Sequence, residues 1–361
     1  MVAVMRILRT VFFPFLALLL APTLAACSGG ETPLDTPIEA PSEKWTWVPF
    51  SNAFCANGDT TGIAVNLTSK SKRVVVYLEG GGACWDENTC YTLGASQHVA
   101  SGYGEDEFEA DFTDELPTVE TANIFDRRDS GNPFRDMSFV YIPYCTGDLH
   151  GGDNVVTYGD HTTHHAGAAD VAAFLKRIVP TFPDAERVVL AGASAGAYGA
   201  SFNWWRVQEA FGKVRVDLLN DSGPPLDPPY LSETYVKDWR EHWKLNQVMP
   251  PDCAGCQQSF GALFDYYGEH LGANRAALLS YTTDSILPIY FDITKEQGSE
   301  GIAKVVVDHF DPYPGFHAFF AEGESHVLLT SKTPVSTKGV KLQEWLGQMV
   351  NDDPAWTSVH P

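Results

Sequence analysis

The sequence predicts an α/β fold with a mostly parallel central sheet and helices on both faces. Two observations carry this prediction. Short apolar runs typical of buried strands recur at residues 74–79, 137–142, 187–193, 214–219, 276–281 and 316–321. Amphipathic patterns typical of helices lie at residues 165–178, 198–211 and 340–350. Such alternation packs helices on both faces of the sheet, and functional groups then gather at the carboxyl ends of its strands.

The first 27 residues have the pattern of a targeting segment. Two arginines precede an apolar run at residues 11–20 that is too short to span a bilayer, and Leu24-Ala25-Ala26 stands directly before Cys27. This resembles the lipobox of bacterial lipoproteins and implies a lipid anchor at Cys27. A plain secretory signal, with Cys27 incidental, is the alternative. Either interpretation predicts an exported chain, as a cell-envelope lipoprotein (periplasmic or cell-surface) or otherwise secreted, whose only membrane contact is the lipid.

Composition indicates how the remaining chain is organised. Residues 28–44 contain three prolines and few apolar side chains, which predicts a flexible tether, and residues 45–361 are expected to form a single α/β-hydrolase-like catalytic domain. The formal net charge is −22, from 46 acidic and 24 basic residues. So acidic a chain repels nucleic acid and anionic lipid, and it argues against a heavily charged anionic substrate.

Six cysteines remain besides Cys27, and an even number in an exported chain predicts disulfides. Local spacing favours Cys84 with Cys90 and Cys253 with Cys256, which leaves Cys55 and Cys145 for each other, although six cysteines alone leave the pairing open. The spacing of these cysteines does not match a zinc site. The run His161-x-x-His164-His165 lacks accompanying ligands and favours a helix start instead. No metal or cofactor is expected.

Two glycine-rich turns carry possible chemistry. Gly192-Ala193-Ser194-Ala195-Gly196 lies between a predicted strand and a predicted helix, as the nucleophile elbow of α/β-hydrolases does. Glu79-Gly80-Gly81-Gly82 follows the predicted strand at residues 74–79 and looks like the H-G-G-G oxyanion loop of esterases, with glutamate in place of histidine. An ordinary tight turn is the alternative for each.

An acid and a base follow two later strands. Asp284 comes after residues 276–281 and His326 after residues 316–321, so the chain order is Ser194, Asp284, His326, as in α/β-hydrolases. A serine hydroxyl needs an imidazole to take its proton, and the imidazole needs a carboxylate to fix its tautomer. Three other acids are candidates, namely Asp221, which directly follows a strand but resembles a turn cap, Asp265 and Asp292. The rival base is His317, which lies inside the apolar run at residues 316–321 and is therefore more typical of a packed or surface imidazole.

Several segments together resemble the pectin acetylesterase and Notum family of α/β-hydrolases. They are residues 77–85 with Cys90, residues 132–134, residues 141–148, the Ser194 turn and Ser325-His326. The resemblance implies a serine carboxylesterase with Ser194, Asp284 and His326 as its catalytic triad. It also implies an oxyanion hole formed by the N–H groups of Gly81, Gly82 and Ala195, and it supports the Cys84–Cys90 and Cys55–Cys145 pairings.

The chain departs from the family pattern where Gly82-Ala83 replace a tryptophan and a second bulky residue. The expected substrate is an O-acetyl group on a polysaccharide such as pectin. A longer acyl chain is the runner-up, because Gly82 and Ala83 leave room. A catalytically inactive, surface-anchored carbohydrate-binding protein is the alternative of another class. Aromatic side chains near the candidate loops are either carbohydrate contacts or core: Trp85, Trp204 and Trp205.

Overall fold

The computed structural model describes residues 35–112, 124–331 and 333–360. The predicted targeting segment, with Cys27, and the first residues of the predicted tether lie outside these ranges. Ile38 is 5% exposed, and its N–H donates to Thr181 Oγ1 at 2.7 Å, so this part of the predicted tether packs on the domain. Within the described ranges no helix combines the length and the apolar character that crossing a bilayer requires.

The main sheet has eight strands in the order β1-β2-β4-β3-β7-β8-β9-β10. Neighbouring strands from β4 to β10 run parallel, whereas β2 is antiparallel to both β1 and β4. The strands span Thr46–Phe54 (β1), Thr60–Asn66 (β2), Arg73–Leu78 (β3), Ser138–Ile142 (β4), Arg187–Ala193 (β7), Arg215–Asp221 (β8), Ala276–Tyr281 (β9) and Phe316–Ala321 (β10). The predicted mostly parallel sheet is confirmed, and the β1–β2 hairpin at its edge is an addition.

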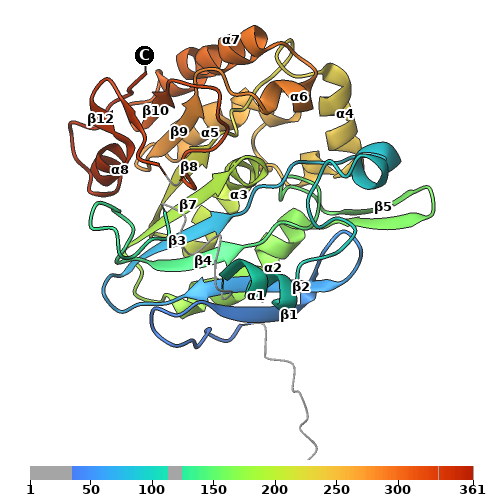
Figure 1. The fold of residues 1–361 in the computed structure, drawn as a ribbon, viewed down its shortest axis with the longest axis horizontal. Helices are drawn as coiled ribbons and strands as arrows, with labels where there is room; N and C mark the ends of the chain where they lie inside the picture. The colour runs from blue at the N-terminus through green and yellow to red at the C-terminus, as the bar shows by residue number, and fades with distance from the viewer. Residues whose placement is uncertain (1–34, 113–123, 332, 361) are drawn as a thin grey trace, which may run out of the picture. The chain divides into compact units, whose positions relative to one another are not determined.

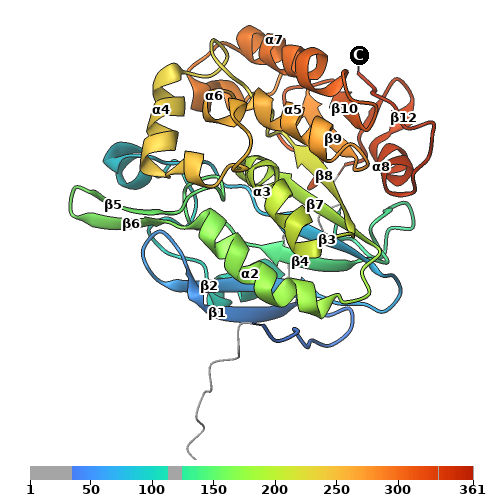
Figure 2. The same cartoon turned by 180° about the vertical axis from the view of Figure 1, so that it is seen from behind.

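Helices cover both faces of this sheet. Figure 2 shows α2 (Gly167–Thr181) and α3 (Ala195–Phe211) in front of the strands, and Figure 1 shows α1 (Glu105–Phe112) on the opposite side. Alternate residues of β3 serve the two cores, because Leu78 packs in the cluster that contains α3 and Tyr77 in the cluster that contains α1 and α8 (Leu342–Val350). The arrangement is an α/β-hydrolase-like fold.

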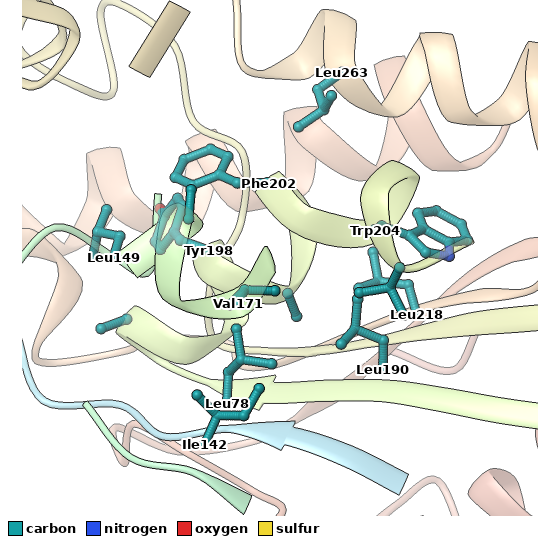
Figure 3. Close-up of a cluster of buried hydrophobic side chains, with 14 of the residues drawn as sticks. Leu78, Ile142, Leu149, Val171, Leu190, Tyr198, Phe202, Trp204, Leu218 and Leu263 are labelled. Atoms are coloured by element: carbon teal, nitrogen blue, oxygen red, sulfur yellow. The ribbon is translucent and has the colours of Figure 1, made fainter. Parts of the chain in front are cut away.

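The larger core fixes α3 against the sheet. Leu78, Leu190 and Leu218 come from three neighbouring strands and point toward α3 in Figure 3. Trp204 of α3 is 0% exposed, and its indole N–H donates to the carbonyl of Val216 at 2.7 Å. Truncation of such a residue to alanine costs about 3–5 kcal/mol. This packing holds the helix that begins directly after Ser194.

Shorter elements complete the fold. They are β5 (Asn154–Tyr158), β6 (His161–His165), α4 (Glu233–His242), α5 (Gly261–His270), α6 (Leu287–Phe291), α7 (Lys295–Val305), β11 (Ser336–Thr337), β12 (Val340–Lys341) and the single turns η1 (Asn88–Thr92), η2 (Leu245–Gln247), η3 (Gly255–Gln257) and η4 (Val306–Phe310). The helix start expected at residues 161–165 is wrong, because this run with its two β-branched threonines pairs with β5 and α2 begins only at Gly167. No cluster of metal-ligating side chains occurs in the part of the chain that the structure describes.

Three disulfides join the cysteines: Cys55–Cys145, Cys84–Cys90 and Cys253–Cys256. The first ties the residue after β1 to the segment after β4. The second closes the loop that continues from the glycine run at residues 80–82, so it braces that run. Disulfides of this number form and persist in oxidising compartments.

Candidate active site

Ser194 stands on a sharp turn between β7 and α3. Its backbone has φ 54° and ψ −121°, a region that L-residues rarely adopt and that costs about 1–3 kcal/mol. The turn is held from outside, because the N–H of Ser194 donates to the carbonyl of Asp221 at 2.8 Å. The serine side chain is therefore presented at the carboxyl edge of the sheet.

The two glycines of the Ser194 turn are required by close backbone approach. A Cβ on Gly196 would lie 2.0 Å from the carbonyl oxygen of Leu78, and a Cβ on Gly192 would lie 2.1 Å from the carbonyl oxygen of Gly196. Neither neighbour is a flexible side chain that can move aside. The G-x-S-x-G pattern is therefore what allows the turn to pack directly on β3.

The structure brings the three predicted residues together. His326 Nε2 lies 2.7 Å from Ser194 Oγ, and His326 Nδ1 lies 2.7 Å from Asp284 Oδ2. Asp284 follows β9 and His326 follows β10, two neighbouring parallel strands whose carboxyl ends meet at one edge. The resulting chain of hydrogen bonds connects a hydroxyl, an imidazole and a buried carboxyl, as nucleophilic catalysis by serine requires.

Asp284 has a second task. Its Oδ1 accepts the N–H groups of Ile286 at 2.8 Å and Leu287 at 3.0 Å, at the start of α6. Because Oδ1 is occupied there, Oδ2 is directed at the imidazole. One carboxyl thus orients His326 and holds the beginning of a helix.

Asp221 supports the loop that carries His326. It is fully buried, and its Oδ2 accepts the N–H groups of Leu328 at 2.8 Å and Leu329 at 2.7 Å. The hydroxyl of the next residue, Ser222, donates to the backbone carbonyl of His326. Burial raises the pKa of Asp221 to about 7. The expectation that Asp221 caps its own turn is therefore incomplete, because its carboxyl mainly caps the loop after His326.

The other rival residues lie elsewhere. Asp265 bonds His309 Nδ1 at 2.9 Å, and Asp292 is exposed at the end of α6. His317 packs edge-on against Trp356, and burial lowers its pKa. None of these three lines the cavity at Ser194 in the described chain.

The glycine loop after β3 lies beside Ser194. Gly81 and Gly82 have φ of 150° and 84°. Two hydrogen bonds to backbone carbonyls hold this loop. The N–H of Gln97 donates to the carbonyl of Gly81 at 2.8 Å, and His150 Nε2 bonds the carbonyl of Glu79 at 2.8 Å. The amide N–H groups of Gly81, Gly82 and Ala195 have no hydrogen-bond partner among the described residues. Free amides next to a serine hydroxyl are suited to bind an oxyanion.

Ser194 opens into a cavity of about 620 Å³, which we call the main cavity. It is lined by Tyr77, Glu79, Gly80, Gly81, Gly82, Gly94, Ala95, Gln97, Phe125, Tyr141, Ala193, Ser194, Ile286, Tyr290, His326, Val327 and Thr330. Glu79 accepts the N–H of Tyr144 at 2.9 Å, yet burial outweighs this bond and raises the pKa of Glu79 to about 7. No lysine or arginine of the described chain lines this cavity.

A second space, which we call the side cavity, has a volume of about 30 Å³. Its lining consists of Gly82, Ala83, Leu149, Ser194, Ala195, Tyr198, Trp239, Ile286, Leu287, Tyr290 and Phe291. The sequence interpretation missed Ile286 and Tyr290, although both lie within six residues of Asp284. The tryptophans considered as carbohydrate contacts line neither cavity, because Trp85 and Trp204 belong to the core and Trp205 packs beside it.

Comparisons with known proteins agree on one family. A family model described as Pectinacetylesterase matches residues 45–262. The palmitoleoyl-protein carboxylesterase notum2 of Xenopus laevis is 28% identical over 194 residues, which is 51% of this chain and 37% of that protein. The palmitoleoyl-protein carboxylesterase NOTUM of Schmidtea mediterranea is 27% identical over 187 residues, 50% of this chain and 34% of that protein. The chain thus spans about a third of the length of these curated relatives.

A solved structure supports the same fold. The crystal structure of the Wnt deacylase Notum from Drosophila superposes with a TM-score of 0.67 at 18% sequence identity. The match covers 89% of this chain and 96% of the Notum chain. At this identity the likeness concerns the fold alone, and it includes the central sheet and the helices that flank it.

Proposed function

We propose that this chain, which belongs to the pectinacetylesterase family, is a serine carboxylesterase that removes a small acyl group, above all acetyl, from a carbohydrate hydroxyl. One observation carries the proposal. Ser194, His326 and Asp284 form a continuous chain of hydrogen bonds, with both distances 2.7 Å, beside amide N–H groups that have no partner among the described residues. The family and its relatives support ester hydrolysis, and the residues above supply each group that it needs.

In the acylation step, Ser194 Oγ attacks the carbonyl carbon of the ester and its proton passes to His326 Nε2. The electron pair of the carbonyl double bond moves to oxygen, where the N–H groups of Gly81, Gly82 and Ala195 are placed to stabilise the negative charge. Asp284 stabilises the imidazolium through Nδ1. Collapse of the intermediate breaks the bond to the alcohol oxygen, which takes the proton from His326 and leaves as the free alcohol.

Deacylation repeats these steps with water. The water oxygen attacks the acyl carbon of the Ser194 ester, and its proton passes to His326. The oxyanion returns its electron pair, the bond to Ser194 Oγ breaks, and the serine recovers a proton from the imidazolium. The products are a carboxylic acid and the unmodified enzyme, so the cycle needs no redox partner.

The main cavity favours an uncharged sugar as the alcohol. Its lining includes three almost fully buried aromatic side chains, namely Tyr77, Phe125 and Tyr141, so much of its wall is apolar and uncharged. Glu79 is the only acid among the described residues that line it, and a net charge of −22 repels anionic polymers. We therefore expect acetylated neutral polysaccharide or methyl-esterified pectin to be preferred over de-esterified pectin.

Hydrolysis of longer acyl esters is the second candidate. The relatives that carry the name palmitoleoyl-protein carboxylesterase favour it. The side cavity opposes it, because about 30 Å³ holds a group of one or two carbon atoms and no fatty acyl chain.

Export and a lipid on Cys27 remain proposals about location. Three disulfides support folding outside the cytoplasm. Incorporation of labelled lipid into the wild type and not into Cys27→Ala is the expected result, and equal labelling of both would remove the anchor.

The test of the function is hydrolysis by the purified chain. Wild type should release acetate from acetylated xylan and acetylated pectin, and it should react with a fluorophosphonate probe. Ser194→Ala should lose both properties, with turnover reduced by about 10³-fold or more, whereas Ser101→Ala at an exposed position should change neither. Full esterase activity in Ser194→Ala contradicts the proposal, and a folded wild type that neither reacts nor hydrolyses favours the inactive binding protein.

A further inference from the structure

We infer that Tyr290 is the residue that limits the length of the acyl group, because it forms the partition between the main cavity and the side cavity. The inference rests on the proposed function and assigns a specificity-determining role to a residue of α6. It follows from how the two cavities share their walls, from where the leaving alcohol must be, and from how Tyr290 is held in place.

The two cavities meet at Ser194. Gly82, Ile286 and Tyr290 line both of them together with the serine, so these three residues separate a space of about 620 Å³ from one of about 30 Å³. The buried side chains of Leu149, Trp239 and Phe291 also line the side cavity. The small volume between these packed side chains leaves space for a short group only.

The position of His326 assigns a role to each cavity. The leaving alcohol takes its proton from His326 Nε2, so the alcohol oxygen must lie on the histidine side of Ser194. His326 lines the main cavity and does not line the side cavity. The alcohol therefore occupies the main cavity, and the acyl carbon chain, on the other side of the carbonyl, points into the side cavity.

Tyr290 is fixed against the glycine loop. Its hydroxyl donates to the carbonyl of Ala95 at 2.7 Å, which connects α6 with the loop after η1. A Cβ on Gly82 would lie 2.4 Å from Tyr290 Oη and 2.1 Å from the Ala95 carbonyl oxygen. Tyr290 thus fills the space beside Gly82. The expectation that Gly82 leaves room for a longer acyl chain is wrong at this position for that reason.

Removal of the tyrosine side chain should join the two cavities. An acyl chain of four to eight carbon atoms could then continue from the side cavity into the main cavity, where volume is available. In wild type the same chain would collide with the ring of Tyr290. The predicted consequence is a change of chain-length preference, with the chemistry at Ser194 preserved.

The experiment compares kcat/KM for p-nitrophenyl acetate, butyrate and octanoate. Wild type should prefer acetate, and Tyr290→Ala should raise the octanoate-to-acetate ratio by about 10- to 100-fold, the range expected for relief of an apolar clash. Tyr290→Phe, which loses only the bond to Ala95, should change the ratio by less than about 3-fold. Ile289→Ala, an exposed neighbour on the same helix, should not change it.

The outcomes separate the inference from the proposed function. An unchanged chain-length ratio in Tyr290→Ala, with activity on acetate retained, overturns the inference alone. A wild type that hydrolyses none of the esters overturns the proposed function. Fluorophosphonate labelling verifies that each variant is folded around Ser194, and Tyr290→Val provides a second test if the alanine variant does not fold. An unchanged octanoate-to-acetate ratio of kcat/KM in Tyr290→Val would likewise overturn the inference that Tyr290 separates the two cavities.

Discussion

Buried carboxyl groups have different partners at the two edges of the central sheet. At the amino edge of β7, β8 and β9, Asp217 lies 3.4 Å from Arg187 and 3.1 Å from Arg215, and Asp352 bridges the arginines from the surface. At the carboxyl edge, Glu79, Asp221 and Asp284 form no ion pair with a lysine or arginine of the described residues. Their partners are backbone N–H groups, hydroxyls and the imidazole of His326.

The comparison indicates what each edge is built for. Two guanidinium groups hold the Asp217 carboxyl in place by ion pairs, which suits a structural role, although burial still raises its pKa to about 6. At the carboxyl edge backbone amides hold the acids instead, and burial raises the pKa of Glu79 and of Asp221 to about 7. The following predictions test whether chemistry and stability really divide between the two edges.

The largest effect is expected for Asp284→Asn. Loss of the carboxylate removes the partner that fixes the tautomer of His326, so kcat should fall by about 10³- to 10⁴-fold. Asp221→Asn should reduce kcat less, because Asp221 acts only through the loop after His326. Asp292→Asn, at an exposed position, should leave kcat unchanged. Steady-state kinetics on an aryl acetate measure all three, and the reverse order would move the acid role to another aspartate.

At the amino edge we expect loss of stability without loss of chemistry. Arg187→Met leaves Asp217 buried with fewer partners and should lower the free energy of unfolding by about 3–5 kcal/mol. The value of kcat, measured well below the melting temperature, should stay within about 2-fold of wild type. Lys72→Met breaks an exposed pair with Glu186 and should cost about 0–1 kcal/mol. Chemical denaturation measures the free energies of unfolding. A fall in kcat without a loss of stability would show that chemistry and stability are not divided between the two edges.

The smallest effect concerns pH and Glu79. Burial raises its pKa to about 7 from 4.5, so between these values the folded chain binds more protons than the unfolded chain. The free energy of unfolding must therefore fall as the pH rises through this interval, and the contribution is complete only below pH 4.5.

Glu79→Gln removes this titration. The loss of stability between pH 5 and pH 8 should shrink by on the order of 1 kcal/mol, seen as a melting temperature that changes by a few degrees less. Other buried carboxyls whose pKa is raised in the same sense, Asp217 and Asp221 among them, keep the remainder. Glu186→Gln at the exposed surface should leave the wild-type pH dependence intact. An unaltered pH dependence in Glu79→Gln would mean that Glu79 stays ionised in the folded chain.

The sequence predicted the parts of the molecule that depend on local pattern. Buried parallel strands are continuous apolar runs, so β3, β4, β7, β8, β9 and β10 were visible within one or two residues. Ser194, Asp284 and His326, which lie within hydrogen-bonding distance in the structure, were selected because each follows a strand within five residues, in a known chain order. The β1–β2 hairpin was missed, and β6 was mistaken for a helix start. Both elements depend on pairing with a neighbouring strand, which the local sequence pattern does not show.

The walls of the cavities were less predictable for the same reason. Tyr290 and Ala95 are separated by 195 residues, and their hydrogen bond exists only through the tertiary fold. The role of Asp221 likewise depends on a loop 107 residues away. A glycine in the sequence shows that its own position has no side chain. It does not show which side chain from a distant part of the sequence fills the space beside it.

The two carboxyl oxygens of Asp284 bind different groups, which has a consequence for how the substrate preference of this site can evolve. Its two oxygens belong to different functions, one to proton transfer and the other to the first turn of α6. A lineage that replaced this aspartate would disturb reactivity and substrate choice in a single step. Altered ester preference should therefore arise by exchange of side chains within residues 286–291 around a retained aspartate, and libraries for directed evolution are best confined to that short stretch.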